Sequence, residues 1–203
     1  MCDAVVKEYA RQAKTYDKRW KHYVEATTKE TLSRLHLKGS ETLLDVGCGT
    51  GVLLYRLSKK YPAMQLSGVD PVKEMLNVAR QKLPSSIDLR EGWATQLPIT
   101  DHQFDVVICC SMFHYIRDPQ AALNEIRQVL RPDGRLVITD WCNDFFTMRL
   151  TDLFLRCFNQ AHFRSYGVKN IKNLLAENHF TVVDIDHYKI SRWWEMMMIC
   201  ATA

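Results

Sequence analysis

Short apolar runs alternate with segments of helical spacing five times between residues 42 and 140, and this alternation constrains the fold more than any other feature of the sequence. The apolar runs are predicted strands, and the segments between them repeat apolar residues every three or four positions, as helices do. A helical connection carries the chain back across a sheet, so the strands that it joins run parallel. The pattern therefore predicts an α/β fold with a doubly wound, mostly parallel sheet. The expected strands are residues 42–46, 66–69, 87–91, 104–110 and 135–139.

The helices between these strands are expected at residues 52–61, 70–83 and 118–130. Two of them begin with an Asp-Pro pair, Asp70-Pro71 and Asp118-Pro119. Aspartate accepts hydrogen bonds from the free N–H groups of a first helical turn, and proline fits the first helical position. We therefore expect each aspartate to cap the helix that follows it.

The segments before residue 42 and after residue 140 do not continue this alternation of strands and helices. Residues 3–38 are predicted to be helical, with a second helix at about 24–37, because apolar residues recur there at helical spacing. After residue 140, helices are expected at 145–158 and 168–178, and strands at 181–186 and 194–201. The link between these two strands is too short for a parallel crossover, so the last strand is expected to be antiparallel. We predict one seven-stranded, Rossmann-like domain over residues 1–203, divided into residues 1–39, 40–140 and 141–203.

Composition places the chain among globular proteins, because 47% of its 203 residues are hydrophobic and 25% are charged. Its start lacks the apolar core of a secretory signal. Seven cysteines without a C-x-x-C pair indicate reduced thiols in a cytoplasmic protein, and no metal site. The net charge of +4 resides in residues 1–38 and is too small to argue for a nucleic-acid partner. A basic helical face of this kind can still meet a membrane surface.

A glycine-rich loop follows the first expected strand and opens the first expected helix, with the sequence Asp45-Val46-Gly47-Cys48-Gly49-Thr50-Gly51. Glycines let a backbone turn sharply and approach a ligand closely, and a helix start offers free N–H groups. Asp70 follows nineteen residues after Gly51, at the end of the second strand. A carboxylate in that position can bind both hydroxyls of a ribose. The spacing indicates a nucleoside-containing ligand at the carboxyl ends of the strands.

This loop differs from the loops that bind phosphates. A dinucleotide fingerprint would place a third glycine where Val52 stands, and a phosphate loop would end in Gly-Lys-Ser or Gly-Lys-Thr. Asp45, beside the loop, would repel a pyrophosphate and suits a cationic group. A nicotinamide-dependent oxidoreductase is therefore disfavoured.

Residues 42–140 resemble the class I S-adenosylmethionine-dependent methyltransferases, and most closely their type 11 branch, which acts on small molecules. The resemblance rests on five stretches in order: LLDVGCGTG (43–51), GVDPVKEML (68–76), GWATQLPI (92–99), FDVVICCSMFHYI (104–116) and PQAALNEIRQVLRPDGRLVITD (119–140). It implies S-adenosylmethionine as the cofactor, a small-molecule substrate, and N-terminal helices that fold over the cofactor as a lid.

The resemblance also implies a cofactor site. The backbone at Gly47, Cys48 and Gly49 would hold the methionine part of the cofactor, Asp45 its amino group and Asp70 its ribose. The other implied contacts are Tyr16 on the lid, Pro71, Met75, Trp93 and Ala94 around the adenine, and Ser111 at the methionine end. Family members usually carry an aspartate where this chain has Trp93. Tryptophan cannot accept a hydrogen bond from adenine, but it can stack on the ring.

Methyl transfer from a sulfonium needs alignment of the reactants and exclusion of water, and it needs a base only where the acceptor attacks through a protonated atom. His114 and Asp140 are the candidate catalytic residues, because both lie near the carboxyl ends of strands. The candidate substrate contacts are Trp20, Tyr115, Trp141, Arg149 and Tyr166.

We expect a methyltransferase that acts on a small molecule. Two alternatives stay open: methylation of a lipid headgroup amine at a membrane surface, and an S-adenosylmethionine-binding module without catalytic activity. The oligomeric state is left open.

Overall fold

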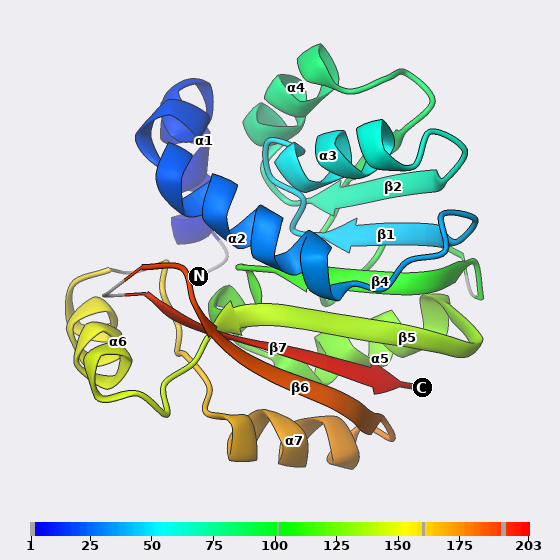
Figure 1. Cartoon of the computed structure of the whole chain (residues 1–203). Helices are drawn as coiled ribbons and strands as arrows, with labels where there is room; N and C mark the ends of the chain where they lie inside the picture. The colour runs from blue at the N-terminus through cyan, green and yellow to red at the C-terminus, as the bar shows by residue number, and fades with distance from the viewer. Residues whose placement is uncertain (1–2, 101, 160, 192–193) are drawn as a thin grey trace.

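The computed structural model describes residues 3–100, 102–159, 161–191 and 194–203, and a seven-stranded sheet lies at its centre (Figure 1). The order across the sheet is β3-β2-β1-β4-β5-β7-β6, and β7 runs antiparallel to both of its neighbours. This arrangement confirms the predicted doubly wound sheet with an antiparallel last strand. The strands are β1 (Thr42–Val46), β2 (Gln65–Asp70), β3 (Asp88–Glu91), β4 (Phe104–Cys110), β5 (Leu130–Trp141), β6 (Thr181–Lys189) and β7 (Glu195–Thr202).

Helices cover both faces of the sheet (Figure 1). One face packs against α5 (Pro119–Val129) and α7 (Val168–Glu177), and the other against α3 (Val52–Lys60) and α4 (Lys73–Lys82). Two further helices, α1 (Asp3–Arg19) and α6 (Phe146–Phe158), lie at the end of the sheet toward which β1 and β5 point. The remaining elements are α2 (Lys21–Arg34), which connects α1 to β1, and a short 3-10 helix, η1 (Phe113–Tyr115), after β4.

Strand β4 is buried on both faces, as its almost continuous apolar run predicts; Asp105, near its start, is only partly buried. Val107 and Cys109 belong to the core beneath α5 and α7, whereas Val106 and Ile108 belong to the core beneath α3 and α4. The strand order reverses between β1 and β4, because the chain passes outward to β3 and then returns to pair β4 with β1. Open α/β sheets bind their ligands at such a switch point, outside the carboxyl ends of the strands.

The two Asp-Pro pairs behave differently. Asp118 caps α5, because its Oδ1 accepts a hydrogen bond from Ala121 N at 3.0 Å, and this confirms the prediction for that helix. The prediction that Asp70 caps α4 is wrong, because α4 begins only at Lys73 and its N-cap is Val72. Asp70 is instead the last residue of β2.

Other predicted elements differ from the structure at their ends. The second helix begins at Lys21 and ends at Arg34, because the chain turns at Trp20 and leaves the helix at the buried Leu35. Strand β5 is longer than predicted, because Leu130 already pairs with Phe104, ahead of the predicted start at Arg135. None of the described helices combines the length and the hydropathy that are needed to cross a membrane.

Helix α1 packs against α4 through an apolar stripe. Ala13 is buried against Val72 and Met75, and the partly buried Val6 and Tyr9 extend the same cluster. Because α4 follows β2, this packing holds α1 above the carboxyl ends of the strands, at the point where the strand order reverses.

Candidate functional site

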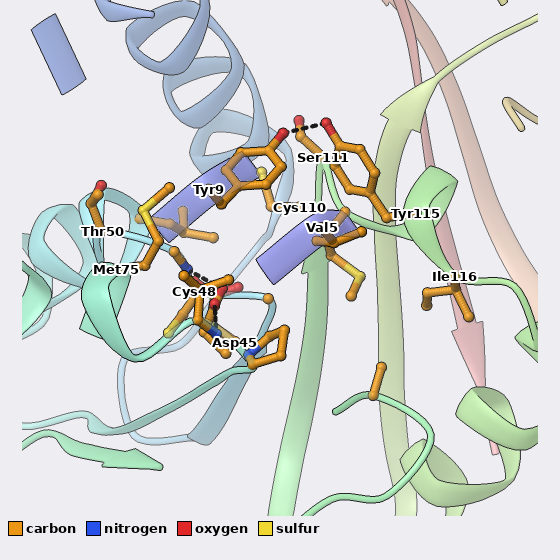
Figure 2. Close-up of a pocket in the computed structure, with 18 of the residues that line it drawn as sticks. Val5, Tyr9, Asp45, Cys48, Thr50, Met75, Cys110, Ser111, Tyr115 and Ile116 are labelled. Atoms are coloured by element: carbon orange, nitrogen blue, oxygen red, sulfur yellow. Dashed lines mark hydrogen bonds between the residues drawn. The ribbon is translucent and has the colours of Figure 1, made fainter. Parts of the chain in front are cut away.

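A cavity of about 320 Å³ lies at the carboxyl ends of β1, β2 and β4, at the switch point of the sheet. The loops after these strands line it from one side, and side chains of α1 and α2 line it from the other (Figure 2). The structure brings together, on the wall of this cavity, the eleven residues that the sequence analysis expects to contact the cofactor: Tyr16, Asp45, Gly47, Cys48, Gly49, Asp70, Pro71, Met75, Trp93, Ala94 and Ser111.

The glycine-rich loop turns tightly against β2. Gly47 N and Cys48 N both donate to Val69 O, at 2.7 and 3.1 Å. Gly47 and Gly49 have φ angles of +73° and +53°, in the left-handed region that favours glycine. A Cβ atom on Gly47 would lie 2.7 Å from Met112 Cγ, whereas one on Gly49 would meet nothing within 4 Å. Gly49 therefore presents bare backbone to the open space of the cavity.

The Asp70 carboxylate faces this loop from the end of β2. Gly49 N donates to its Oδ2 at 2.8 Å, and Val72 N donates to its Oδ1 at 2.8 Å. Each oxygen keeps acceptor capacity for a ligand hydroxyl. Burial raises the pKa of Asp70 from its ordinary 3.8 to about 6, against the lowering effect of the two backbone bonds. Asp70 is therefore mostly ionised at pH 7.

The Asp45 carboxyl group lines the same cavity, and its Oδ1 is buried without a hydrogen-bond partner. Burial, and then the nearby charge of Asp70, raise the pKa of Asp45 well above its ordinary value. Buried polar atoms without partners are uncommon in folded proteins and call for an explanation. A cationic ligand group beside Asp45 would provide the missing partner and favour the charged form of the carboxyl.

Four tyrosines line the cavity from α1, α2 and η1: Tyr9, Tyr16, Tyr23 and Tyr115. The hydroxyl groups of Tyr9 and Tyr115 are hydrogen-bonded to each other (Figure 2), and Tyr23 Oη donates to Ser111 Oγ at 2.8 Å. Burial raises the pKa of Tyr9 to about 12, and it also raises the pKa of each of the other three. This wall is therefore uncharged at pH 7.

Tyr23 is a cavity residue that was not predicted from the sequence. The signal that could have found it is the spacing of Tyr9, Tyr16 and Tyr23, which stand seven residues apart, or two helical turns. The turn at Trp20, between α1 and α2, keeps all three on the cavity side.

The residues expected around the adenine line the cavity along α4 and the loop after β3. Met75 belongs to α4, and Trp93 belongs to a turn that is closed by a 3.0 Å bond from Gln96 N to Trp93 O. The indole is half-buried, so it keeps an aromatic surface for stacking.

His114 and Asp140 form a buried pair that does not belong to the cavity wall. His114 Nδ1 lies 2.6 Å from Asp140 Oδ1, and His114 N donates to Asp140 Oδ2 at 3.0 Å. Trp141 stacks on the imidazole, with 4.3 Å between the ring centroids. Tyr115, which does line the cavity, lies 4.0 Å from the same imidazole by ring centroids. His114 is thus connected to the cavity through Tyr115.

The two tryptophans expected to contact the substrate lie behind Tyr23. Trp141 Nε1 donates to Tyr23 Oη at 2.8 Å, and Trp20 packs edge-on against the Tyr23 ring. Neither is on the cavity wall, whereas Tyr115, a third expected substrate contact, is.

The last two expected substrate contacts lie further away. Tyr166 is buried in the core against Phe113. Arg149 is exposed on α6, and its Nε donates to Asn143 O at 3.0 Å. The structure does not bring these two side chains to the cavity.

One group of described residues outside the cavity has the donor set of a metal site. Donor atoms of Cys142, Asp144 and His187 lie within 4.8 Å of one another. Asp144 Oδ2 accepts a hydrogen bond from Val168 N at 2.9 Å, at the start of α7. The positive end of a helix dipole disfavours a cation there, so we assign Asp144 to the stability of α7.

Comparison with known proteins places this chain among methyltransferases. A profile of the methyltransferase domain, type 11, matches residues 44–138. Demethylmenaquinone methyltransferase of Lactobacillus johnsonii is 30% identical over 180 residues, which cover 86% of this chain and 68% of that protein. An uncharacterized methyltransferase of Mycobacterium bovis is 37% identical over 107 residues, and there the match spans 53% of this chain and 42% of the relative.

Solved structures share the fold at low sequence identity. A methyltransferase solved in a complex with the Haloferax volcanii Trm112 methyltransferase activator has a TM-score of 0.85 at 19% identity, with 97% of both chains covered. The 1,6-didemethyltoxoflavin-N1-methyltransferase of Burkholderia thailandensis has a TM-score of 0.77 at 17% identity, with 99% of this chain and 88% of that chain covered. That structure holds S-adenosylhomocysteine and 1,6-didemethyltoxoflavin.

The cavity fits the cofactor of such enzymes. The bare backbone at Gly49 leaves room beside the loop, the unpartnered Asp45 Oδ1 suits an ammonium group, and Asp70 has acceptors free for a ribose. The alternatives raised from the sequence, a lipid headgroup as acceptor and a non-catalytic binding module, gain no support from the comparisons. The chain belongs to the type 11 family of class I S-adenosylmethionine-dependent methyltransferases.

Proposed function

We propose that this chain transfers a methyl group from S-adenosylmethionine to a small-molecule acceptor by in-line displacement. The observation that carries the proposal is the pair of buried carboxyl groups, Asp45 and Asp70, on either side of the glycine-rich loop in one cavity. Together they offer a partner for a cation and a partner for two hydroxyls. That is the combination required by an amino acid whose side chain is joined to a ribose, as in S-adenosylmethionine.

In this proposal, Asp70 accepts hydrogen bonds from the ribose hydroxyls and Asp45 faces the amino group of the methionine part. Gly47, Cys48 and Gly49 contact that part through their backbone, and Ser111 closes its far side. The adenine lies between Pro71 and Met75 on one side and Trp93 and Ala94 on the other, under the ring of Tyr16.

S-adenosylmethionine supplies a methyl group made electrophilic by the attached sulfonium, so the protein has to align the acceptor and exclude water. Tyr9, Tyr16, Tyr23 and Tyr115 suit that task, because they carry hydroxyl groups on rigid, apolar rings. Since burial raises their pKa values, they act as neutral hydrogen-bonding groups rather than as bases.

We assign His114 and Asp140 a positioning role in this reaction. Asp140 fixes the His114 ring, and the ring in turn packs on Tyr115 at the cavity wall. Neither residue touches the cavity, so we do not place a general base there.

A small-molecule acceptor agrees with the enclosed shape of the site. Helices α1 and α2 cover the cavity, so an acceptor must fit beneath them. The acceptors named for two similar proteins, demethylmenaquinone and 1,6-didemethyltoxoflavin, are small molecules as well.

Calorimetric titration of the purified chain tests the cofactor part of this proposal. We expect S-adenosylmethionine and S-adenosylhomocysteine to bind with micromolar affinity. Reduced nicotinamide adenine dinucleotide should not bind. An acceptor screen with methyl-labelled S-adenosylmethionine then tests transfer, with Asp70→Ala as a control that should transfer less label at a cofactor concentration below saturation. Cofactor binding without label transfer to any acceptor would contradict catalysis, and absence of binding would contradict the whole assignment.

Tyr9 provides a second test, because it connects the lid to the core. Its hydroxyl pairs with Tyr115, 106 residues away, while Asp17 at the other end of α1 pairs with Lys82 and Thr50. We expect Tyr9→Phe to speed release of S-adenosylhomocysteine by about two- to tenfold, since one hydrogen bond contributes ~0.5–1.5 kcal/mol. Stopped-flow displacement measures this rate.

Tyr55→Phe is the matched control for Tyr9→Phe, because Tyr55 lies exposed on α3. The control should release the product at the wild-type rate. Equal rates for both variants and the wild type would show that the tyrosine pair does not hold α1 in place.

A further inference from the structure

Helix α6 presents an apolar face to solvent. Five of its side chains are between 54% and 75% exposed: Phe146, Leu150, Leu153, Phe154 and Phe158. They recur at three- and four-residue intervals and so form one stripe along the helix. Aromatic side chains each present ~150–250 Å². The stripe therefore reaches the size at which exposed apolar patches mark a binding surface.

The exposed charges that α6 itself carries are positive. The exposed charged residues of α6 are Arg149 and Arg156, whereas its acid, Asp152, is buried. Asp152 makes a 2.8 Å contact with His162 Nε2 and a looser one, of 3.8 Å, with Arg156. Two arginines thus stand along the apolar stripe with donors available to an anionic partner.

The same end of the molecule carries the basic helix α1 (Figure 1). Its exposed charged side chains, among those the structure describes, are all basic: Lys7, Arg11, Lys14, Lys18 and Arg19. The acids of α1 whose side chains are described, Glu8 and Asp17, are partly buried, and Asp17 is paired with Lys82. An apolar stripe with a basic surround is the arrangement of helices that lie in the surface of an anionic membrane.

We propose that α6 docks this chain onto an anionic lipid surface. Its phenylalanines and leucines would enter the boundary between headgroups and acyl chains, while Arg149 and Arg156 would meet lipid phosphates. A second copy of the chain fits this surface less well. Self-association through α6 would bring the arginines of one copy against those of the other, because α6 itself has no exposed carboxylate.

Docking would also orient the site. Helix α6 follows the carboxyl end of β5, and the cavity lies at the carboxyl ends of β1, β2 and β4, so both share one edge of the sheet. The cavity would then open near the lipid surface. The docking itself does not depend on methyl transfer, and it is measured without cofactor or acceptor.

Vesicle cosedimentation of the full chain tests the proposal. We expect binding to vesicles of equal parts phosphatidylcholine and phosphatidylglycerol, and at least tenfold weaker binding to phosphatidylcholine alone. Phe154→Ser/Phe158→Ser should weaken binding to the anionic vesicles at least tenfold. Arg149→Gln/Arg156→Gln should weaken it by roughly fivefold for each arginine, and added salt should weaken it in the wild type.

Two variants serve as matched controls: Val183→Ser, at an exposed apolar position on β6, and Arg127→Gln, at an exposed position on α5. Both should bind vesicles like the wild type. Light scattering of the same samples detects the competing occupant. A dimer that Phe154→Ser/Phe158→Ser dissociates, without vesicle binding, would overturn the proposal in favour of a second copy. A monomer that binds neither vesicle would overturn it outright.

Discussion

Replacing Asp70 with alanine should weaken the affinity for S-adenosylmethionine roughly 10- to 150-fold, because it removes charge-assisted hydrogen bonds of ~1.5–3 kcal/mol. The carboxylate holds Gly49 N and Val72 N at 2.8 Å each, so it also shapes the loop that contacts the ligand. Calorimetric titration at pH 7 measures the change. Asp88→Ala, which removes an exposed aspartate at the start of β3, is the control and should bind like the wild type.

The affinity should also depend on pH through the same residue. Because burial raises the pKa of Asp70 to about 6, the empty cavity gains a proton there as the pH falls through 6. The ribose hydroxyls need the ionised form, so affinity should fall below pH 6 and level off above it. Titration of Asp70 should lower the wild-type affinity by up to one log unit for each pH unit below 6. Asp70→Asn cannot titrate at this position, so its affinity should fall less steeply over the same range.

The sign of the shift also bears on stability. A raised carboxyl pKa means that ionisation is less favourable in the folded chain than in the unfolded chain, so the contribution of this group to the free energy of unfolding falls as the pH rises from 3.8 through about 6. Both Asp70 variants also change the hydrogen bonds to Gly49 N and Val72 N, so thermal melts are needed to test whether a change in affinity reflects unfolding. Unchanged affinity of Asp70→Ala would show that the ribose does not bind at this carboxylate.

Local sequence predicts the sheet because the features that make it are local. A strand that is buried on both faces must be apolar along its buried length, and every residue from Val106 to Cys110 is. A strand with one face in solvent would instead alternate between apolar and polar residues. The antiparallel last strand follows from the short link before it. The boundaries were less predictable, because they depend on distant partners: Leu130 extends β5 only by pairing with Phe104.

Dependence on a distant partner also explains why the prediction of a helix cap at Asp70 is wrong. An Asp-Pro pair before a helix indicates a cap, and Asp118 is one. Asp70 has the same local sequence, but its carboxylate is held by Gly49, 21 residues earlier, a contact that no local pattern reveals.

The residues of the cavity wall could be predicted where the backbone of one βαβ unit forms the wall. They were missed where side chains from other elements complete it. The glycine loop and Asp70 follow from spacing along one βαβ unit, and they line the cavity. Tyr23 reaches it only because the chain turns at Trp20. His114 stands close to the cavity in sequence, next to Tyr115, but its ring is drawn into the core by Asp140.

Asp140 lies at the centre of the buried hydrogen bonds behind the cavity. Its Oδ1 accepts from Trp141 N at 2.7 Å and contacts His114 Nδ1 at 2.6 Å, and its Oδ2 accepts from His114 N at 3.0 Å. The side chains of His114 and Asp140 are almost fully buried, at 2% and 4% exposure. Removing the carboxylate would therefore leave three nitrogen atoms without their partner in the core. Each unsatisfied buried group of this kind costs ~1–3 kcal/mol.

We therefore expect Asp140→Ala to lower the free energy of unfolding by about 3–5 kcal/mol and the melting temperature by about 6–20 °C. Chemical denaturation measures the first and calorimetry the second. Asp140→Asn keeps one acceptor and should lose about half as much, while Asp88→Ala should lose little, because its partner Arg90 is half exposed. At temperatures where Asp140→Ala remains folded, its affinity for S-adenosylmethionine should match that of the wild type, because Asp140 lies outside the cavity wall. A stable Asp140→Ala variant that has lost cofactor binding would instead place this carboxylate in the site itself.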